Sequence, residues 1–416
     1  MKFNKSFHTP DPVPAKGVEN AKRLMETGHL FRYNPLDTPE NYIDSEKNGQ
    51  TKLYSDVALL EQEFCEYTGH KYAVAVNSCG SAMFLALKAS GVEHGVKVFS
   101  NAFTFTAVPS SIVHAGGTPV YLECNADYLL DVDDFKQKVK ENPDVRYLLL
   151  SYMRGHIADV AHIKQVCDEN DICLIEDCAH SLGVKWQDEG SEVSHHIGHH
   201  GAAACFSAQS NKLINAGEGG MLVTDDPELA AHCILAAGSY ELLYQQHLAR
   251  PDDDVFEKIK LRIPNYSLRM NNLTAAVIRP QIPELDEKVS AYNALYSQLE
   301  EIFTNIEHVE TPSILPQVSR VGDSFQFNLV DMTASQIQRF LQRAREQGLE
   351  LQVFGHTDNA RYFRNWLYSF EETPSLEQTE EIITAACDFR LPLSFNSEDL
   401  KLITQIIRQL LSEVKD

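Results

Sequence analysis

Short apolar runs alternate with helical patterns in the first half of the chain, and this alternation limits the possible folds more than any other feature. We predict strands at 73–76, 96–99, 119–122, 147–152 and 173–175, and helices at 57–67, 81–90, 108–114 and 160–169. Strands that alternate with helices are typical of a mostly parallel sheet with helices on both faces. The sequence therefore predicts an α/β fold whose large domain has three layers, α/β/α.

The pattern changes after about Pro280. A long helical pattern starts at Ile282, an alternating strand pattern follows at 325–330, and the helix predicted at 333–347 has a capping box at its start. The segment Ser375-x-x-Gln378 predicts another helix start. We expect an N-terminal arm (1–45), a large domain (46–285) and a smaller α+β domain (286–416).

Charge and composition exclude several classes of partner. The 416 residues carry 36 basic and 59 acidic side chains, a formal net charge of −23 at pH 7. Such a charge disfavours nucleic acid and anionic membrane surfaces as partners. The first residues show no apolar signal core and no apolar run is long enough to cross a bilayer, so we expect a cytoplasmic protein. The nine cysteines include no C-x-x-C pair, which is typical of reduced, buried thiols.

A lysine before a glycine-rich turn and a carboxylate after a buried strand carry the strongest chemical signal. Lys212 stands five residues before Gly217-Glu218-Gly219-Gly220, and Asp177 ends an earlier apolar run. Together they suggest a lysine that forms a Schiff base and a carboxylate that pairs with a pyridine nitrogen, which pyridoxal phosphate enzymes require. His180 would lie near the ring, and Ser207 could donate to the phosphate. Taken alone, Lys212 would be a solvated loop residue and Asp177 a helix cap.

Two further segments could complete a cofactor site. The turn at 77–82 would place Gly80 and Ser81 at a helix N-terminus, which suits a phosphate group. Phe105 follows the next predicted strand, where an aromatic ring can stack on a flat heteroaromatic ring. Each segment has an ordinary alternative, namely a common strand–helix turn and a core phenylalanine.

Four segments together resemble the DegT/DnrJ/StrS family of sugar aminotransferases. The matching stretches are Asn77-Ser78-Cys79-Gly80-Ser81-Ala82, Thr104-Phe105-Thr106-Ala107, Glu176-Asp177-Cys178-Ala179-His180, and Ser207 with Lys212 and Gly217-Glu218-Gly219-Gly220. The resemblance implies the fold-type I architecture of pyridoxal phosphate enzymes and a homodimer with shared active sites. It also implies transfer of an amino group from glutamate or glutamine to a keto or aldehyde sugar.

One segment departs from the pattern of this family. Its members usually show N-x-R-M where a segment reaches the cofactor phosphate of the neighbouring subunit. Here the segment is Asn265-Tyr266-Ser267-Leu268-Arg269-Met270, so Ser267 stands in the place of the usual Asn. The resemblance implies that Ser267, or Asn265 two residues earlier, makes the contact with the partner's phosphate.

Two short stretches, 31–34 and 363–366, resemble a subgroup of transaminases that aminates the acidic sugar Kdo. The substrate could therefore be nucleotide-linked, acidic or phosphorylated. Guanidinium groups bind anionic groups well, and the candidates are Arg32, Arg154 and Arg364. For each arginine taken alone, a surface salt bridge is the better-supported alternative.

Two other functions stay open. Deoxysugar dehydratases resemble this family but carry His where the lysine stands, so Lys212 argues against a dehydratase. A non-catalytic regulator could keep the same fold, but intact Lys212, Asp177 and Ser207 argue against that as well.

Four histidines cluster between His195 and His200. Such a cluster can bind a metal ion, but Gly198 and Gly201 predict a flexible loop and no acidic partner has a set spacing. We expect no metal site.

Overall fold

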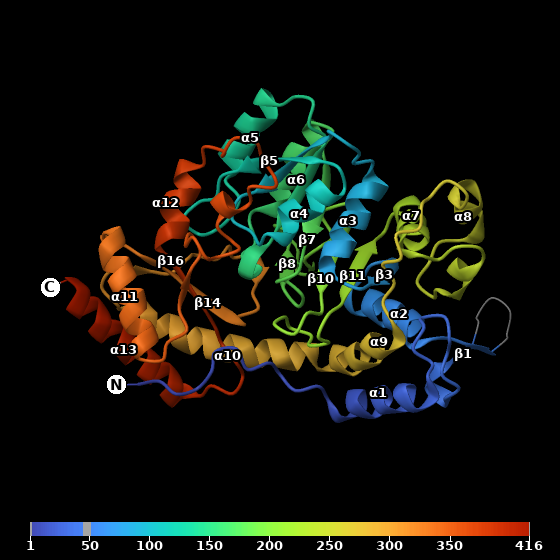
Figure 1. The fold of residues 1–416 in the computed structure, drawn as a ribbon, viewed down its shortest axis with the longest axis horizontal. Coiled ribbons are helices and arrows are strands. Elements are labelled where there is room, and N and C mark those ends of the chain that lie inside the picture. The colour runs from blue at the N-terminus through green and yellow to red at the C-terminus, as the bar shows by residue number, and fades with distance from the viewer. Residues whose placement is uncertain (1, 45–50, 416) are drawn as a thin grey trace.

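The computed structural model describes residues 2–44 and 51–415. Its largest sheet has seven strands in the order β3 (Tyr72–Val76), β11 (Gly220–Thr224), β10 (Ala203–Ser207), β7 (Cys173–Asp177), β6 (Tyr147–Ser151), β4 (Lys97–Asn101) and β5 (Thr118–Leu122). Strand β11 runs antiparallel to both of its neighbours, and the other pairings in this sheet are parallel. The predicted mostly parallel sheet is therefore confirmed (Figure 1).

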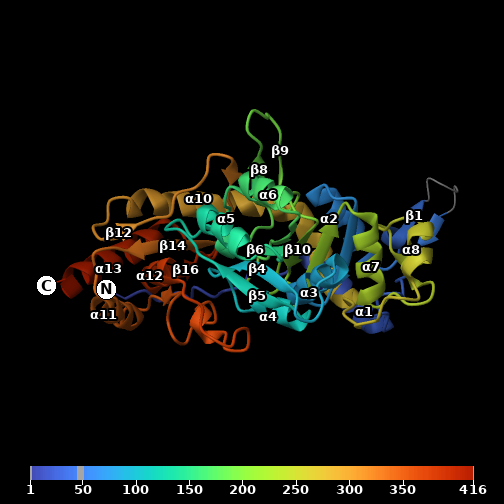
Figure 2. The same ribbon diagram turned by 90° about the horizontal axis from the view of Figure 1, so that it is seen from above.

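Helices cover both faces of this sheet (Figure 2). One face packs against α2 (Asp56–Thr68), α5 (Val132–Glu141) and α6 (Val160–Glu169), and the other against α3 (Cys79–Ser90), α4 (Ala107–His114), α7 (Pro227–Ala237) and α8 (Asp253–Ile259). Leu174 and Ile175 of β7 are both buried but belong to opposite cores. Because successive strand side chains point to opposite faces, a strand buried on both faces has the continuous apolar run seen in the sequence. The three-layer α/β/α arrangement is confirmed.

A second sheet lies in the C-terminal part. Its antiparallel strands follow the order β12 (Val309–Glu310), β14 (Ser324–Leu329), β16 (Ala386–Arg390) and β15 (Gln352–Val353). The helices here are α10 (Leu285–Phe303), α11 (Ala334–Glu346), α12 (Glu377–Ala385) and α13 (Ser397–Lys415). The capping box at Thr333 and Gln336 is present, and Gly348 after α11 has a φ of +83°. The predicted α+β architecture is confirmed for this part of the chain.

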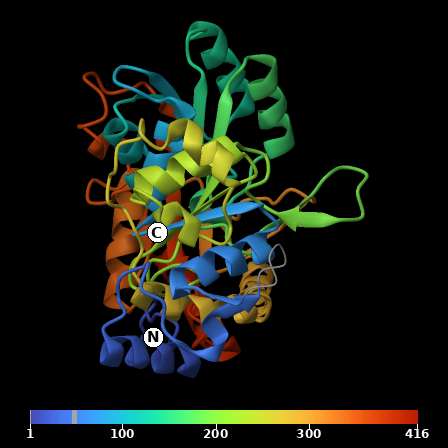
Figure 3. The same ribbon diagram turned by 90° about the vertical axis from the view of Figure 1, so that its right-hand side faces the viewer.

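Several small elements complete the structure. A three-stranded sheet contains β8 (Lys185–Gln187), β9 (Ser194–His196) and β13 (Val318–Ser319), and its hairpin projects from the body of the molecule (Figure 3). The other elements are β1 (Tyr42–Asp44), β2 (Thr51–Leu53), α9 (Asn272–Ile278) and the 3₁₀ helices η1 (Pro39–Asn41), η2 (Met153–Gly155), η3 (Leu243–Gln246), η4 (Arg279–Glu284) and η5 (Phe363–Asn365). All nine cysteines are free thiols. Within the described residues, no helix has the length and apolar character that crossing a membrane would require.

The N-terminal arm is fastened at two places. Phe3 and Phe7 are buried in the core of the second sheet, while helix α1 (Ala15–Thr27) packs on α9. The side-chain amide of Asn272 donates hydrogen bonds of 2.9 Å to the carbonyl groups of His29, Phe31 and Asn34. One buried amide thus satisfies three backbone acceptors of the arm, which fixes an otherwise irregular segment.

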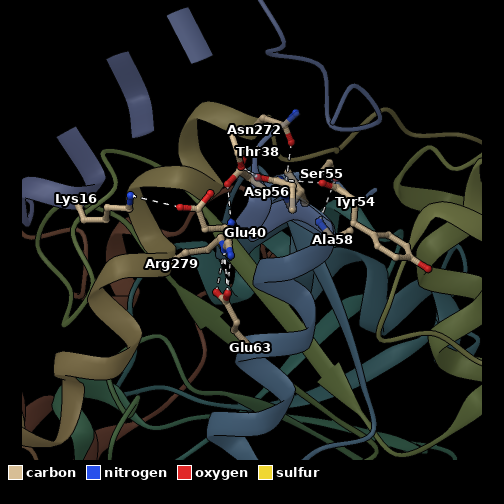
Figure 4. A network of polar contacts seen from close by, with 12 residues as sticks. Lys16, Thr38, Glu40, Tyr54, Ser55, Asp56, Ala58, Glu63, Asn272 and Arg279 are labelled. Atoms are coloured by element: carbon tan, nitrogen blue, oxygen red, sulfur yellow. Dashed lines mark hydrogen bonds and ion pairs between the residues drawn. The ribbon is translucent and has the colours of Figure 1, made fainter. Parts of the chain in front are cut away.

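Arg279 joins helix α2 to the start of η4 (Figure 4). Its guanidinium donates to Asp56 at 2.7 Å and to Glu63 at 2.8 Å, so two turns of α2 are held by one side chain. Lys16 of α1 lies 4.0 Å from Glu40 in the same region. These paired charges orient α2, which supports the sheet from the side of β3.

Arg32 is part of the structural core, so this candidate is not free to bind an anion, and its salt bridge is buried instead of on the surface. Its guanidinium forms a two-pronged ion pair with Glu61, with distances of 3.1 and 3.0 Å, and both side chains are fully buried. The Glu61 carboxylate also accepts hydrogen bonds from His247 at 2.9 Å and from the Ala75 backbone in β3 at 2.9 Å. Burial would raise the pKa of Glu61, but the charges of Arg32 and His247 and their hydrogen bonds together outweigh it, and the pKa falls to about 2.

We expect Glu61→Ala to lower the free energy of unfolding by about 3–5 kcal/mol at pH 7, because it leaves Arg32 buried and unpaired. Since folding lowers the pKa of Glu61, its contribution is present above pH about 4.5 and is lost as the pH falls toward about 2. Urea denaturation measures both effects. As a control, Lys164→Ala removes the exposed pair with Asp168 within α6 and should cost about 0.5 kcal/mol or less. Equal losses in the two variants would contradict the structural role of the buried pair.

Candidate active site

Several polar side chains meet at the carboxyl edge of the large sheet. Strand β6 ends at Ser151, β7 at Asp177 and β10 at Ser207, and Lys212 lies in the loop between β10 and β11. Ligand sites of α/β proteins form at this edge because successive loops converge there. The candidate active site is therefore placed by the sheet itself.

Lys212 has an amine in an unusual environment. Its amine nitrogen, Nζ, lies 2.7 Å from Nε2 of His180. Burial lowers the pKa of Lys212 to about 7, and the positive charges of Arg390 and Arg154 act in the same direction. A large fraction of the amine is therefore uncharged at neutral pH, and only the uncharged form attacks a carbonyl carbon.

Asp177 is a buried carboxylate with three hydrogen-bond donors, of which the Cys79 thiol, 3.8 Å from Oδ1, is the weakest. Oδ2 accepts a hydrogen bond of 2.7 Å from the Ser151 hydroxyl, and Oδ1 accepts one of 3.1 Å from the backbone N–H of Ala179. Burial raises the pKa of Asp177, while these hydrogen bonds and the charge of Lys212 oppose the rise. Ser151 is a site residue that the sequence analysis missed. No motif marks it, and it is found only because β6 and β7 are neighbours.

The ring of His180 contacts Lys212 through Nε2 and has a second nitrogen, Nδ1, on its other side. Its Nδ1 is enclosed and has no hydrogen-bond partner among the described residues. Burial lowers the pKa of His180 well below its usual value, and the charge of Lys212 adds to this effect, so the ring is neutral. A neutral imidazole can accept from the protonated amine of Lys212 or donate to its lone pair.

The predicted phosphate-binding residues Gly80, Ser81 and Ser207 are brought together by neighbouring strands. Val76, Gly220 and Ser207 are direct partners in one row of β3, β11 and β10, and the turn with Gly80 and Ser81 follows Val76. Helix α3 starts in this turn and is capped by Ser78, whose hydroxyl accepts from the Ser81 N–H at 3.1 Å. A Cβ at Gly220 would lie 2.3 Å from the carbonyl group of Ser78, so the glycine permits this close approach.

Phe105 lies beyond the end of β4, and 40% of its side-chain surface is exposed. The guanidinium of Arg361 lies 5.4 Å from the centre of its ring. A hydrogen-bond chain connects this loop with Asp177, because the Thr104 hydroxyl donates to Ser151 Oγ at 2.7 Å and Ser151 in turn donates to Asp177. Because the side chain of Phe105 is exposed, the alternative that it is a core residue does not apply.

Ser267 is exposed and has a φ of +57°. Its hydroxyl donates to the side-chain oxygen of Asn265 at 3.3 Å. The segment lies beside the start of the phosphate turn of its own chain, where the Asn77 N–H donates to the Leu268 carbonyl at 2.9 Å. Ser267 is therefore near the predicted phosphate position and accessible from outside the chain.

The remaining arginine candidates differ in their surroundings. Arg364 is exposed and forms a two-pronged ion pair with Glu380 at 2.5 Å, so it has the ordinary structural role. Arg154 is buried beside the site, has a φ of +58° and pairs with Asp388 of β16. Two nearby arginines, Arg361 and Arg390, were not among the candidates.

The predicted flexible histidine loop is partly strand β9. Possible ligand atoms of Asp188, His195 and His200 lie within 4.8 Å of one another on and below the projecting hairpin. His199 is held by the structure instead, since its ring contacts the Thr68 carbonyl at 2.8 Å. The expectation that no metal binds here stays a prediction.

A larger cavity lies away from Lys212, between α1, α2 and η4. Its lining includes Arg279 together with Asp56 and Glu63. These charged groups are already paired with one another, as Figure 4 shows, so they offer no free group for chemistry.

Comparison with known proteins identifies the family. The model of the DegT/DnrJ/EryC1/StrS aminotransferase family matches residues 37–408. The spore coat polysaccharide biosynthesis protein SpsC of Bacillus subtilis (strain 168) is 30% identical over 295 residues, which is 70% of this chain and 74% of that protein. The GDP-perosamine synthase of Caulobacter vibrioides (strain ATCC 19089 / CIP 103742 / CB 15) is 29% identical over 235 residues, 56% of this chain and 58% of that protein.

A solved structure agrees with the fold. The crystal structure of 3-amino-5-hydroxybenzoic acid synthase has a TM-score of 0.79 and covers 98% of this chain and 99% of its own, at 22% sequence identity. The chain therefore belongs to the DegT/DnrJ/EryC1/StrS aminotransferase family, and it is a transaminase.

Proposed function

We propose that this transaminase uses pyridoxal phosphate, held through Lys212, to move an amino group from glutamate or glutamine to a keto or aldehyde sugar. The observation that carries the proposal is the partly buried Lys212 amine, with its lowered pKa and its 2.7 Å contact with His180, at the same sheet edge as Asp177. This combination supplies a nucleophilic amine and an orienting carboxylate in one place.

The residues present fit the cofactor. The row formed by Val76, Gly220 and Ser207 leads into the N-terminus of α3, where backbone N–H groups favour an anion. Gly80, Ser81 and Ser207 would hold the phosphate, Phe105 would stack on the ring, and Asp177 would pair with the ring nitrogen. Ser151 and Ala179 already orient the Asp177 carboxylate, which is an arrangement suited to a charged ring N–H. When bound, the cofactor supplies an electron sink for the bond-breaking step at the substrate carbon.

Lys212 has two tasks in this reaction. Its uncharged Nζ would hold the cofactor through its aldehyde group, and when released the same atom would move the proton at the substrate carbon. When His180 Nε2, at 2.7 Å, accepts an N–H of Nζ, it orients the amine and leaves the nitrogen lone pair free. The neutral state of the His180 ring leaves the proton transfer to Lys212.

A sugar is the acceptor that the relatives support. Their names refer to the synthesis of spore coat polysaccharide and of GDP-perosamine. A dehydratase is disfavoured because Lys212 is present. A regulator without catalysis is disfavoured as well, because a lysine with a lowered pKa has no structural benefit in a buried position.

We also propose a homodimer with shared sites. Ser267 is exposed and lies beside the phosphate turn, at the edge of the sheet that β3 forms. From there its hydroxyl, or the amide of Asn265, could reach the cofactor phosphate of a second subunit.

Reduction of the purified protein with borohydride should attach the cofactor covalently to Lys212, and peptide mass spectrometry locates the label. Lys212→Ala should lower kcat by at least about 10²–10⁴-fold, because the proton-transferring group is gone. Lys97→Ala, which removes an exposed lysine paired with Asp144, is the matched control and should retain full activity. Labelling of any other lysine would overturn the central assignment.

The pKa of Lys212 predicts the pH dependence of cofactor binding. A lowered pKa means that the amine is uncharged above pH about 7, so the rate at which apoprotein captures pyridoxal phosphate should rise up to that pH and then level off. Stopped-flow absorbance measures this rate, with Nα-acetyl-lysine as the reference amine. A rate that keeps rising to pH about 10, as for the reference, would show that the lysine is not perturbed.

Mixing two inactive variants tests the shared site. In dimers of Lys212→Ala with Ser267→Glu, one site contains both lesions and the other contains neither. Random exchange of subunits should therefore restore roughly a quarter of the sites. Ser267→Asn should remain active, since Asn tolerates a positive φ. If mass spectrometry confirms exchange and no activity returns, each chain builds its own pocket.

A further inference from the structure

The clustered histidines between His195 and His200 have different surroundings in the fold. His196 packs its ring on Tyr67, with ring centres 4.5 Å apart, and His199 contacts a backbone carbonyl of α2 at 2.8 Å. Because successive side chains point to opposite faces of a strand, His195 lies on the other face of β9 from His196. The rings of His195 and His200 lie beside each other, with centres 5.6 Å apart. Two of the four histidines are therefore engaged by packing, and the other two form a pair.

The structure places a carboxylate next to this pair. Asp188 follows strand β8, and its Oδ2 lies 3.9 Å from Nδ1 of His195 on strand β9. The two strands are antiparallel and make Trp186 and His195 direct partners, which brings Asp188 to the same end of the hairpin as His195. Possible ligand atoms of Asp188, His195 and His200 lie within 4.8 Å of one another. No spacing in the sequence marks Asp188, because the pairing of β8 with β9 brings it there.

The separation of these atoms suits a divalent transition-metal ion. Zinc binds nitrogen and carboxylate ligands at about 2.0–2.2 Å, so the ligand atoms of a tetrahedral site are about 3.3–3.5 Å apart. Oδ2 of Asp188 and Nδ1 of His195 exceed this separation by about 0.5 Å, and any pair of the three ligand atoms exceeds it by at most about 1.5 Å. Asp188 is exposed and both histidines are half-buried, so small side-chain rotations can close these gaps.

Two further observations point to a ligand at this place. Nδ1 of His200 is enclosed and has no hydrogen-bond partner within the described part of the chain, although buried polar atoms normally have one. The indole N–H of Trp186 donates to Oδ1 of Asp188 at 3.0 Å, which orients the carboxylate and leaves Oδ2 on the side of His195. A donor behind a ligating carboxylate is typical of metal sites, because it fixes the direction of the ligand atom.

The three side chains come from two parts of the fold. Asp188 and His195 belong to the hairpin of β8 and β9, which projects from the body of the molecule (Figure 2). His200 lies below the hairpin, where its backbone N–H donates at 2.8 Å to Glu176, a buried residue of β7. An ion bound by all three would therefore connect the hairpin with the large sheet.

We propose that Asp188, His195 and His200 form a binding site for a divalent transition-metal ion such as Zn²⁺, which joins the projecting hairpin to the body of the protein. Imidazole ligands favour zinc-like ions over Mg²⁺ and Ca²⁺, which prefer oxygen ligands. Three protein ligands leave a fourth position for water. Strand β9 and Asp188 remove both reasons for the sequence-based expectation that no metal binds here. The site does not depend on the proposed amino transfer.

Titration calorimetry with Zn²⁺ tests the site in the holoenzyme, without an affinity tag and after dialysis against a chelator. We expect one ion per chain. Asp188→Asn and His195→Asn should each weaken binding by at least about 10–100-fold, since loss of a group that only orients a ligand already costs that much. The control His94→Asn removes an exposed histidine outside the cluster and should leave the affinity unchanged. Mg²⁺ should not compete with Zn²⁺.

Proteolysis tests the connection between the hairpin and the body. Glu189 and Glu192 are exposed in the turn between β8 and β9, where a glutamate-specific protease can cut. Zn²⁺ should slow cleavage at these two positions in the unchanged protein but not in Asp188→Asn, and peptide mass spectrometry locates the cuts. Cleavage that Zn²⁺ does not slow in the unchanged protein would contradict the connection.

The proposal is overturned if the unchanged protein binds no ion at one per chain. It is also overturned if Asp188→Asn and His195→Asn bind Zn²⁺ as tightly as the unchanged protein while their urea midpoints show that they are folded. Neither measurement uses turnover, so both results would leave the role of Lys212 untouched.

Discussion

The site depends on the close approach of β11 to the turn that follows β3. Strand β11 enters the sheet in the opposite direction between β3 and β10, and only a residue without a Cβ fits at Gly220 against the Ser78 carbonyl. This contact brings three distant parts of the sequence to one edge: the phosphate turn, Ser207 and the loop that carries Lys212. If β11 were displaced, the residues proposed to bind the phosphate and Lys212 would move away from each other.

Local patterns predicted the features that depend on neighbours in the sequence. The strands of the large sheet have apolar residues on both faces, so their runs could be recognised without knowledge of their partners. The capping box at Thr333 formed as predicted, because both of its partners lie within one turn. The helix predicted to open at Ser375-x-x-Gln378 is present, although Ser375 does not cap it. Helix α12 begins at Glu377 without a side-chain cap, and the amide of Gln378 donates instead to the Cys124 carbonyl in the large-sheet part of the chain.

The parts of the site that no pattern revealed depend on contacts over long distances. Arg154 and Asp388 are 234 positions apart, and nothing in either segment indicates the other. Arg32 looked as available as Arg154 in the sequence, yet its guanidinium is fully engaged by Glu61. The sequence shows which residues are arginines, but it does not show how many carboxylates surround each one in the fold. An arginine whose charge is fully paired is structural, whereas one with unpaired donors can hold a ligand.

The arm that starts the chain has a consequence for how substrates enter. Its first residues are anchored in the core of the C-terminal sheet through Phe3 and Phe7, and its helix α1 is anchored on α9. The C-terminal sheet and helix α9 cannot move widely apart unless these anchors are released. Each buried phenylalanine contributes about 1.5–3 kcal/mol against release. A wide hinge opening between these two anchored parts is therefore unfavourable in this molecule.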